Sequence, residues 1–356
     1  MTRQCIKNIP LKQLTEQVKA MEEPEFRARQ IIKWVYQKRV DSFNAMTTLS
    51  KSLREKLGEV YSCEKLPVRS VLVSKYGDAV KFAVGLRNTR HVAECVLLVD
   101  GKRRTACLSS QLGCGLGCVF CATGTMGFLR NLTLDEIIGQ LIAINDYLGA
   151  RDDKLVTNIV FMGMGEALSN FDTFRDALDI IMHEDTFNIG GRRITVSTAG
   201  VIPSVERLMT LDLNIGLAIS LNAWSDEERS RIMPVNRTYP IASLVDIAKR
   251  YYEKTGRRVT FEYVLIAGKT DTADGVNALV DMLGGFPCKI NLIPLNVYGQ
   301  AELRRTPEKT LLWFADELHR RGIAATVRKS RGQDISGACG QLAGRDDVCP
   351  SLSASS

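Results

Sequence analysis

The sequence predicts an α/β protein in which an incomplete (β/α)6 barrel follows an N-terminal accessory domain of helices and a small sheet. From residue 133 to 328, helix-like and strand-like segments alternate, which is the order that produces a parallel sheet. Before residue 100, a helical stretch gives way to short strands. With 356 residues, 45% of them hydrophobic, the chain can build one large core and a smaller domain.

The accessory domain is predicted over 1–98. Apolar residues recur at helical spacing over 11–21 and 26–37, and a third helix is expected over 49–57. Strands are expected over 70–74, 79–86 and 92–99, with a hairpin turn at 76–78. The helical stretch is rich in Lys and Arg. A solvated face explains any one of these residues, and as a group they suit contact with phosphates.

The core domain is predicted over 99–333, and 334–356 forms a C-terminal segment. Strands are expected over 105–108, 157–162, 193–197, 215–221, 258–266, 289–292 and 324–328. Helices are expected over 133–147, 171–183, 203–209, 241–254, 272–283 and 307–321. In such a barrel the active residues lie at the C-terminal ends of the strands.

A loop at the start of the core carries three cysteines in the spacing C-x3-C-x2-C, namely Cys114, Cys118 and Cys121. Three thiolates on one short loop can bind three irons of a 4Fe-4S cluster and leave the fourth iron open to a small ligand. Glycines at 113, 115 and 117 allow the tight curl that this requires. The spacing is similar to that of the radical S-adenosylmethionine (SAM) superfamily. A zinc knuckle is the alternative, but no second cysteine pair completes the usual four ligands; unrelated buried cysteines are the other.

Small polar side chains and glycines end four successive predicted strands. They lie in the segments 162–166, 197–200, 220–222 and 291–296. Glycine lets a ligand approach the backbone, and Glu166 offers a carboxylate to the ammonium group of SAM. Each segment alone is also explained as turn chemistry, and their recurrence favours a binding site.

The net charge of +7 and the isoelectric point near 8.9 suggest an anionic partner such as RNA, and an ordinary basic enzyme fits equally well.

No signal-peptide pattern opens the chain, and no apolar run reaches the ~18 residues of a membrane span. We therefore expect a cytoplasmic protein without a membrane partner. There the ten cysteines stay reduced, so a functional disulfide has to be transient.

Longer motifs resemble the RlmN/Cfr family of radical SAM RNA methyltransferases over about residues 5–345. They include CLSSQLGCGLGCVFCATGTMGF, FMGMGEALSN, SLNAWSDEERSRIMPVN, NLIPLN and RGQDISGACGQLAG. The branch that is most similar methylates carbon 2 of adenosine in 23S ribosomal RNA, at the peptidyl transferase centre, and in the anticodon loop of tRNA. The resemblance implies a radical SAM core domain, an RNA-binding accessory domain, two SAM molecules per turnover, a 4Fe-4S cluster, an electron donor such as a flavodoxin system, and a monomer.

The resemblance also implies roles for individual residues. The cluster ligands are Cys114, Cys118 and Cys121, and the SAM contacts are Gly165, Glu166, Ser197, Ser220, Leu221, Asn222 and Asn296. Cys339 becomes S-methylated, Cys107 is its resolving partner, and Glu94 is the general base. The methyl carbon bonds to the adenine while still attached to Cys339. Attack by Cys107 then releases the product and leaves a disulfide that has to be reduced.

Carbon 2 of adenine is neither nucleophilic nor acidic, so direct methyl transfer from a sulfonium is very slow and a radical route is needed. Two departures from the family pattern keep alternatives open: Asn222 stands where many relatives carry histidine, and Ala167 stands where proline is common. The second is shared with Cfr-like proteins, so methylation of carbon 8 is the runner-up. A non-catalytic iron–sulfur or zinc RNA-binding protein, or a radical SAM activase, would not need Cys107 and Cys339.

Overall fold

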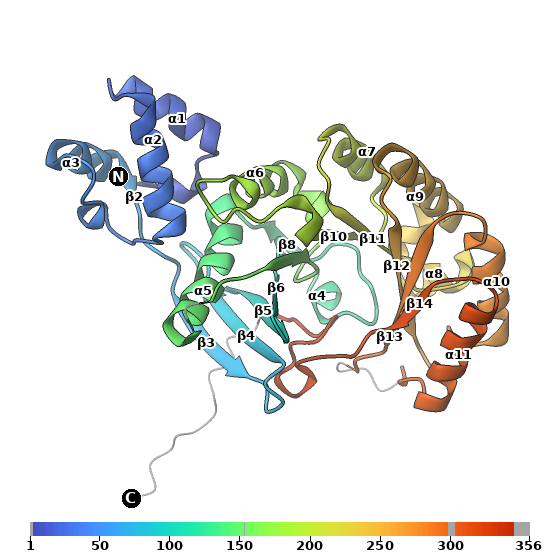
Figure 1. Ribbon diagram of the computed structural model, residues 1–356. Coiled ribbons are helices and arrows are strands. Elements are labelled where there is room, and N and C mark those ends of the chain that lie inside the picture. The colour runs from blue at the N-terminus through green and yellow to red at the C-terminus, as the bar shows by residue number, and fades with distance from the viewer. Residues whose placement is uncertain (1–2, 153, 298–302, 345–356) are drawn as a thin grey trace, which may run out of the picture.

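The computed structural model describes residues 3–152, 154–297 and 303–344, and its centre is a ten-stranded sheet curved into an open barrel (Figure 1). The strands lie in the order β14-β13-β12-β11-β10-β9-β6-β5-β4-β3, so β14 and β3 form the two edges. The seven strands from β6 to β14 are parallel. They are β6 (Arg103–Cys107), β9 (Asn158–Phe161), β10 (Ile194–Thr198), β11 (Gly216–Ser220), β12 (Val259–Leu265), β13 (Cys288–Pro294) and β14 (Ala325–Val327). The predicted α/β barrel is confirmed.

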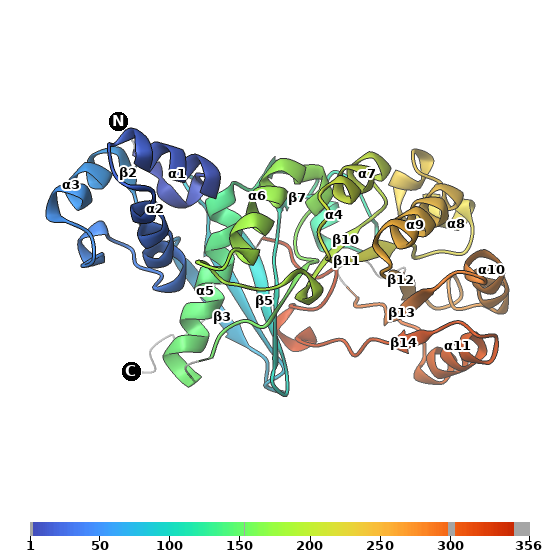
Figure 2. The ribbon, with the colours of Figure 1, turned by 45° about the horizontal axis from the view of Figure 1, so that its top comes forward.

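Six helices connect the parallel strands and cover the outer face of the sheet (Figure 2). They are α5 (Leu134–Asp152), α6 (Phe171–Met182), α7 (Ile202–Thr210), α9 (Ile241–Thr255), α10 (Ala273–Leu283) and α11 (Glu308–Arg320). Their buried apolar faces pack on the strands in one core. Among the described residues, no helix combines the length and the apolar character that crossing a bilayer requires.

Three antiparallel strands extend the barrel sheet beyond β6. They are β3 (Val68–Val73), β4 (Ala79–Gly85) and β5 (Val92–Asp100). Gly77, at φ 68°, forms the tight turn between the first two. Because residues 96–100 of β5 pair with β6, the small sheet is continuous with the barrel.

The N-terminal helices lie to one side of the barrel, at the upper left of Figure 1. They are α1 (Leu11–Ala20), α2 (Glu25–Ile32), which continues as a π-helical turn over Lys33–Gln37, and α3 (Lys51–Val60). A two-residue pairing of β1 (Gln4–Cys5) with β2 (Tyr61–Ser62) closes this unit. Ion pairs of 2.7 Å from Arg39 to Asp146, in α5, and 2.6 Å from Arg29 to Asp185, in the turn after α6, join it to the barrel.

The cysteine loop has local structure that the sequence pattern did not predict. Strands β7 (Gln111–Gly113) and β8 (Phe128–Asn131) pair antiparallel and bring the two ends of the loop together, and α4 (Ala122–Thr125) follows the last cysteine. Gly113 has φ 74°, and a Cβ there would lie 1.9 Å from the carbonyl oxygen of Gly127. Only glycine therefore fits where the hairpin closes.

Candidate active site

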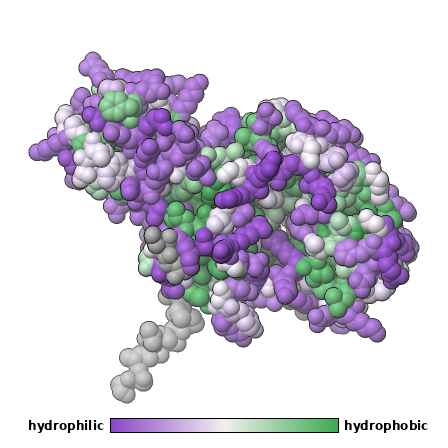
Figure 3. All heavy atoms as spheres, viewed as in Figure 1, coloured by the Kyte–Doolittle hydropathy of each residue, from purple (hydrophilic) through white to green (hydrophobic). Residues whose placement is uncertain are grey.

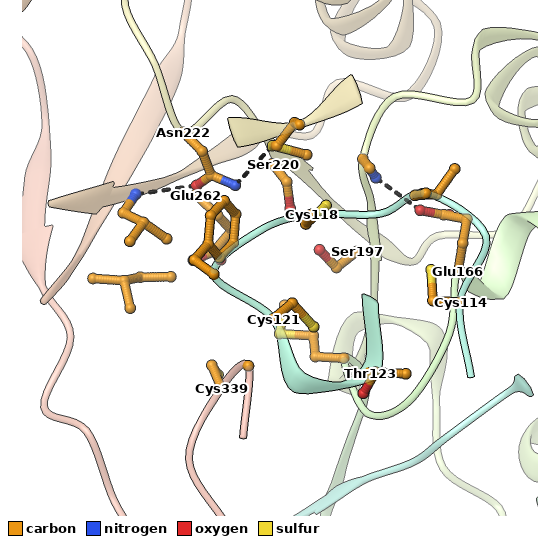
Figure 4. A pocket seen from close by; sticks show the side chains of 18 of the residues that line it. Cys114, Cys118, Cys121, Thr123, Glu166, Ser197, Ser220, Asn222, Glu262 and Cys339 are labelled. Atoms are coloured by element: carbon orange, nitrogen blue, oxygen red, sulfur yellow. Dashed lines mark hydrogen bonds between the residues drawn. The ribbon is translucent and has the colours of Figure 1, made fainter. Parts of the chain in front are cut away.

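A cavity opens at the C-terminal ends of β9 to β13 and contains most of the predicted site residues (Figure 4). Its lining includes Cys114, Cys118, Cys121, Gly165, Glu166, Ser197, Ser220, Asn222, Asn296 and Cys339. Leu221, Cys107 and Glu94 do not line it. The side chain of Leu221, the residue after β11, is fully buried in the core.

The three loop cysteines share one wall of this cavity, and burial raises the pKa of the Cys114 thiol to about 11. Among the described residues, no three His, Cys, Asp or Glu side chains converge on one point as a single metal ion requires. In a 4Fe-4S cluster each thiolate binds a different iron, so three thiols that line one cavity fit three of the ligands of such a cluster.

Residues just before the cysteines hold the loop on the barrel. Ser109 Oγ donates to the carbonyl of Glu94 (2.6 Å) and accepts from the backbone N–H of Met164 (2.7 Å). The side-chain oxygen of Gln111 accepts from the N–H of Glu166 (2.9 Å). These bonds tie the loop to the Gly-Met-Gly-Glu segment after β9. The Ser-Ser-Gln motif therefore positions the site.

Glu166 is buried, and its carboxylate accepts from the N–H groups of Ala199 (2.8 Å) and Leu168 (3.3 Å). Burial raises the pKa of this carboxyl to about 7, against these hydrogen bonds. A cationic ligand group beside it would favour the ionised form. Glu166 is therefore suited to an ammonium group, as the sequence predicts.

A buried arginine that the sequence analysis did not identify fixes the strand ends. The guanidinium of Arg229, on α8 (Asp226–Ile232), donates to the carbonyls of Ala199 (2.7 Å), Ser220 (2.9 Å) and Leu221 (2.9 Å). It also donates to the side chain of Asn236 (2.9 Å). The sequence does mark the start of this helix, because Ser225 and Glu228 form the S-x-x-E pattern of a capping box. In the structure Ser225 Oγ accepts from the N–H of Glu228.

Replacing Arg229 with Met should lower the free energy of unfolding by at least about 3 kcal/mol, because several buried carbonyls lose their donor at once. Urea unfolding followed by circular dichroism measures this. Exposed Arg231, on the same helix, supplies the control Arg231→Met, which should change stability by about 0.5 kcal/mol or less. Equal effects of the two variants would contradict the anchoring role.

A second cavity runs through the barrel interior and shares part of its lining with the first. Residues common to both include Cys121, Glu262, Asn296, Arg328 and Cys339. Cys107, at the end of β6, lines only the second cavity. Burial, and then the charge of Cys339, raise the pKa of Cys107 to about 12. Cys339 therefore lines both cavities, as does Cys121, whereas Cys114 and Cys118 line only the first and Cys107 only the second.

The C-terminal segment is fastened to the cysteine loop just after Cys339. The N–H of Ala122 donates to the carbonyl of Gly340 (2.7 Å), and Thr123 Oγ1 donates to the carbonyl of Leu342 (2.6 Å). Asn296, a predicted SAM contact, donates from its amide to the carbonyl of Cys339 (3.1 Å). Two parts of the chain more than two hundred residues apart thus form one site. Figure 4 shows Cys339 on this segment, below the loop that carries Cys121.

Glu94 on β5 lines neither cavity. One carboxylate oxygen pairs with the buried Nζ of Lys81 (2.9 Å). The other accepts from the N–H groups of Ala343 (2.6 Å) and Gly344 (2.8 Å). In this conformation Glu94 holds the segment that carries Cys339.

Comparison with known proteins assigns the chain. Residues 6–63 match the family described as the ribosomal RNA large subunit methyltransferase N-terminal domain, and residues 108–276 match the radical SAM superfamily. The dual-specificity RNA methyltransferase RlmN of Marinobacter nauticus is 43% identical, over 91% of this chain and 88% of that protein. The chain belongs to the RlmN family. A probable RlmN of Bacillus pumilus is 39% identical, over 96% and 94% of the two chains.

A solved radical SAM methyltransferase has the same fold as this chain. The crystal structure of a radical SAM methyltransferase from Sphaerobacter thermophilus matches with a TM-score of 0.91 and 40% identity, over 96% of this chain and all of that one. The chain is therefore an RNA methyltransferase of the radical SAM type, as its motifs indicated. The Cys loop, the strand ends and the Cys339 segment lie together as the resemblance implied.

Proposed function

We propose that this enzyme methylates carbon 2 of adenosine in 23S ribosomal RNA, at the peptidyl transferase centre, and in the anticodon loop of tRNA. The position of Cys339 carries the proposal. Cys339 lines both the cavity that contains the three loop cysteines and the cavity that contains Cys107. A methyl-carrier cysteine needs access to SAM on one side and to the base and the resolving thiol on the other.

We assign the 4Fe-4S cluster to Cys114, Cys118 and Cys121, and the SAM contacts to Gly165, Glu166, Ser197, Ser220, Asn222 and Asn296. Leu221 takes part through its backbone position alone. When bound, the cluster supplies an electron, and two SAM molecules supply a methyl group and the radical that removes a hydrogen atom. The electron donor is a small redox protein of the flavodoxin kind.

Cys339 and Cys107 carry the methyl carbon and release it. The sulfur of Cys339 holds the carbon as it bonds to carbon 2 of the adenine, which joins protein and RNA. The adduct gives up one electron, for which the oxidised cluster would be the acceptor, and the carbon 2 proton. The sulfur of Cys107 then attacks that of Cys339: an S–S bond forms, the S–C bond breaks, and the released carbon takes up a proton as a methyl group. Both cysteines are free thiols in the structure, as the start of this cycle requires.

The accessory domain, 1–98, is proposed to bind RNA beside the core, 99–333, while 334–356 presents Cys339. Residues 345–356 lie outside the described part of the chain. The face seen in Figure 3 is mainly hydrophilic over the N-terminal helices, which suits a polar partner. We propose a cytoplasmic monomer.

Anaerobic reconstitution with iron, sulfide, reductant, SAM and a 23S RNA fragment tests the proposal, with nucleosides identified by mass spectrometry. The expected product is 2-methyladenosine, from the RNA fragment and from a tRNA anticodon stem-loop. If the product is 8-methyladenosine instead, the carbon 8 alternative holds and the proposed position is wrong.

Glu94 is proposed to accept the carbon 2 proton, which requires it to release the N–H groups of Ala343 and Gly344. Glu94→Gln should slow methylation by on the order of 10²-fold or more, since a positioned base contributes about that much. Peptide mass spectrometry should still find S-methylated Cys339. A purely structural role for Glu94 predicts the opposite pattern, in which Cys339 loses its S-methylation and its segment becomes sensitive to protease.

A further inference from the structure

A buried acidic side chain in the barrel, Glu262 on β12, has one carboxylate oxygen without a hydrogen-bond partner among the described residues. It is 4% exposed and lines both cavities. Its Oε2 atom is buried and has no hydrogen-bond partner among the described residues. A buried carboxylate oxygen without a donor costs free energy, so an unpartnered one inside a cavity indicates a missing ligand.

The neighbours of Glu262 hold it in one orientation. Its Oε1 accepts from the side-chain amide of Asn291 (3.0 Å), and the amide oxygen of Asn291 accepts from Thr326 Oγ1 (2.6 Å). These residues lie on β12, β13 and β14, which are adjacent in the sheet. The chain of bonds fixes which end of the Asn291 amide points at Glu262 and leaves Oε2 free for another donor.

Arg328 lies on the same side of the carboxylate. Its NH1 atom is 3.8 Å from Oε2 of Glu262, which is too far for a hydrogen bond. Arg–carboxylate pairs are frequently bidentate, with N···O distances of about 2.7–2.9 Å. The charge of Cys339 is the largest cause that raises the pKa of Arg328, and the charge of Glu262 adds to it. The guanidinium therefore lies near the methyl-carrier thiol. An acceptor and a set of donors therefore stand side by side beside Cys339.

This pair matches the edge of an adenine. The exocyclic 6-amino group of adenine is a donor, and ring nitrogen 1 beside it is an acceptor. Guanine presents the opposite pattern there, an acceptor oxygen and a donor N–H, which would face the wrong partners. Carbon 2 is next to ring nitrogen 1, so a base held by this edge presents its reacting carbon close to the same side.

We propose that Glu262 and Arg328 form the subsite that recognises the target adenine, with Oε2 of Glu262 accepting from the 6-amino group. This inference rests on the proposed function, since it names the residues that select the base. SAM also contains an adenine, so its base is the other ligand that this subsite could bind. The RNA base is favoured because Asn291, which orients the carboxylate, lines only the cavity that contains Cys107.

Two RNA stem-loops that differ at the target nucleotide test the subsite. One carries adenosine, and the other carries purine ribonucleoside, which lacks the 6-amino group and keeps the carbon 2 hydrogen. Reconstituted wild type and Glu262→Gln are compared by kcat/KM for 2-methylation and by the Kd of each RNA in fluorescence anisotropy without SAM. Glu262→Gln should lower kcat/KM for adenosine RNA by about 10- to 100-fold. It should lower kcat/KM for purine RNA by less than about 2-fold, because this base has no 6-amino group for Glu262 to bind.

Asp100→Asn is the matched control, because Asp100 is a solvent-exposed acid that lines the same cavity and pairs with Arg331 (3.0 Å). Asp100→Asn removes the same charge, so it should change kcat/KM for the two RNAs by the same factor. The inference is overturned if Glu262→Gln lowers kcat/KM equally for the two RNAs. It is also overturned if the variant lowers the affinity for SAM in equilibrium dialysis while the ratio of kcat/KM between adenosine RNA and purine RNA stays unchanged. The second result assigns the carboxylate to SAM. If wild type makes no 2-methylated product, the proposed function fails instead.

Discussion

A Cys107→Ala variant should accumulate RNA joined covalently to Cys339. Without the second thiol, the S–C bond between Cys339 and the methylated base has no nucleophile to break it, and turnover should fall by on the order of 10³-fold or more. Cys107 is the thiol in the right place, because it lines the same cavity as Cys339 and the charge of Cys339 helps to raise the pKa of Cys107. The adduct should form stoichiometrically in one turnover.

Denaturing gel electrophoresis with labelled RNA measures this adduct, and peptide mass spectrometry locates it. Cys95→Ala is the matched control, because Cys95 is a buried cysteine on the neighbouring strand β5 that lines neither cavity. It should behave as wild type and release its product. Recovery of only free protein and unmodified RNA from Cys107→Ala would count against the resolving role.

The second large effect is expected from Cys339→Ala, which removes the sulfur that carries the methyl carbon. Methylation should fall below detection, and no covalent adduct should form even when Cys107 is also replaced. Because Asn296 binds the backbone carbonyl of residue 339, and Ala122 binds that of residue 340, the segment should keep its position. The loss is then chemical, and the unfolding midpoint should stay close to that of wild type.

Nucleoside mass spectrometry of RNA treated with Cys339→Ala measures the product. Cys288→Ala, which replaces a buried cysteine outside both cavities, is the control and should retain activity. Methylation by Cys339→Ala at the wild-type rate would exclude the methyl-cysteine route and leave direct transfer from SAM as the remaining explanation.

Much of the fold followed from local sequence patterns. The predicted strand over 258–266 is β12 (Val259–Leu265), and the predicted helix over 241–254 is α9 (Ile241–Thr255). These elements are long, and their apolar period is clear. The β7–β8 hairpin was missed because its strands are short and two residues of β8, Phe128 and Leu129, are exposed, so no alternation marks it.

By itself, the sequence determined the βα order, the cysteine spacing and the motif residues, because each of these is a property of neighbouring positions along the chain. Only the tertiary structure decided which distant groups meet. It placed Cys339 where it lines both cavities, paired Glu94 with Lys81, and left Oε2 of Glu262 without a partner among the described residues. Such relations depend on strand register and on how the C-terminal segment crosses the barrel. Register is set by packing across the whole sheet, so no single stretch of sequence encodes it.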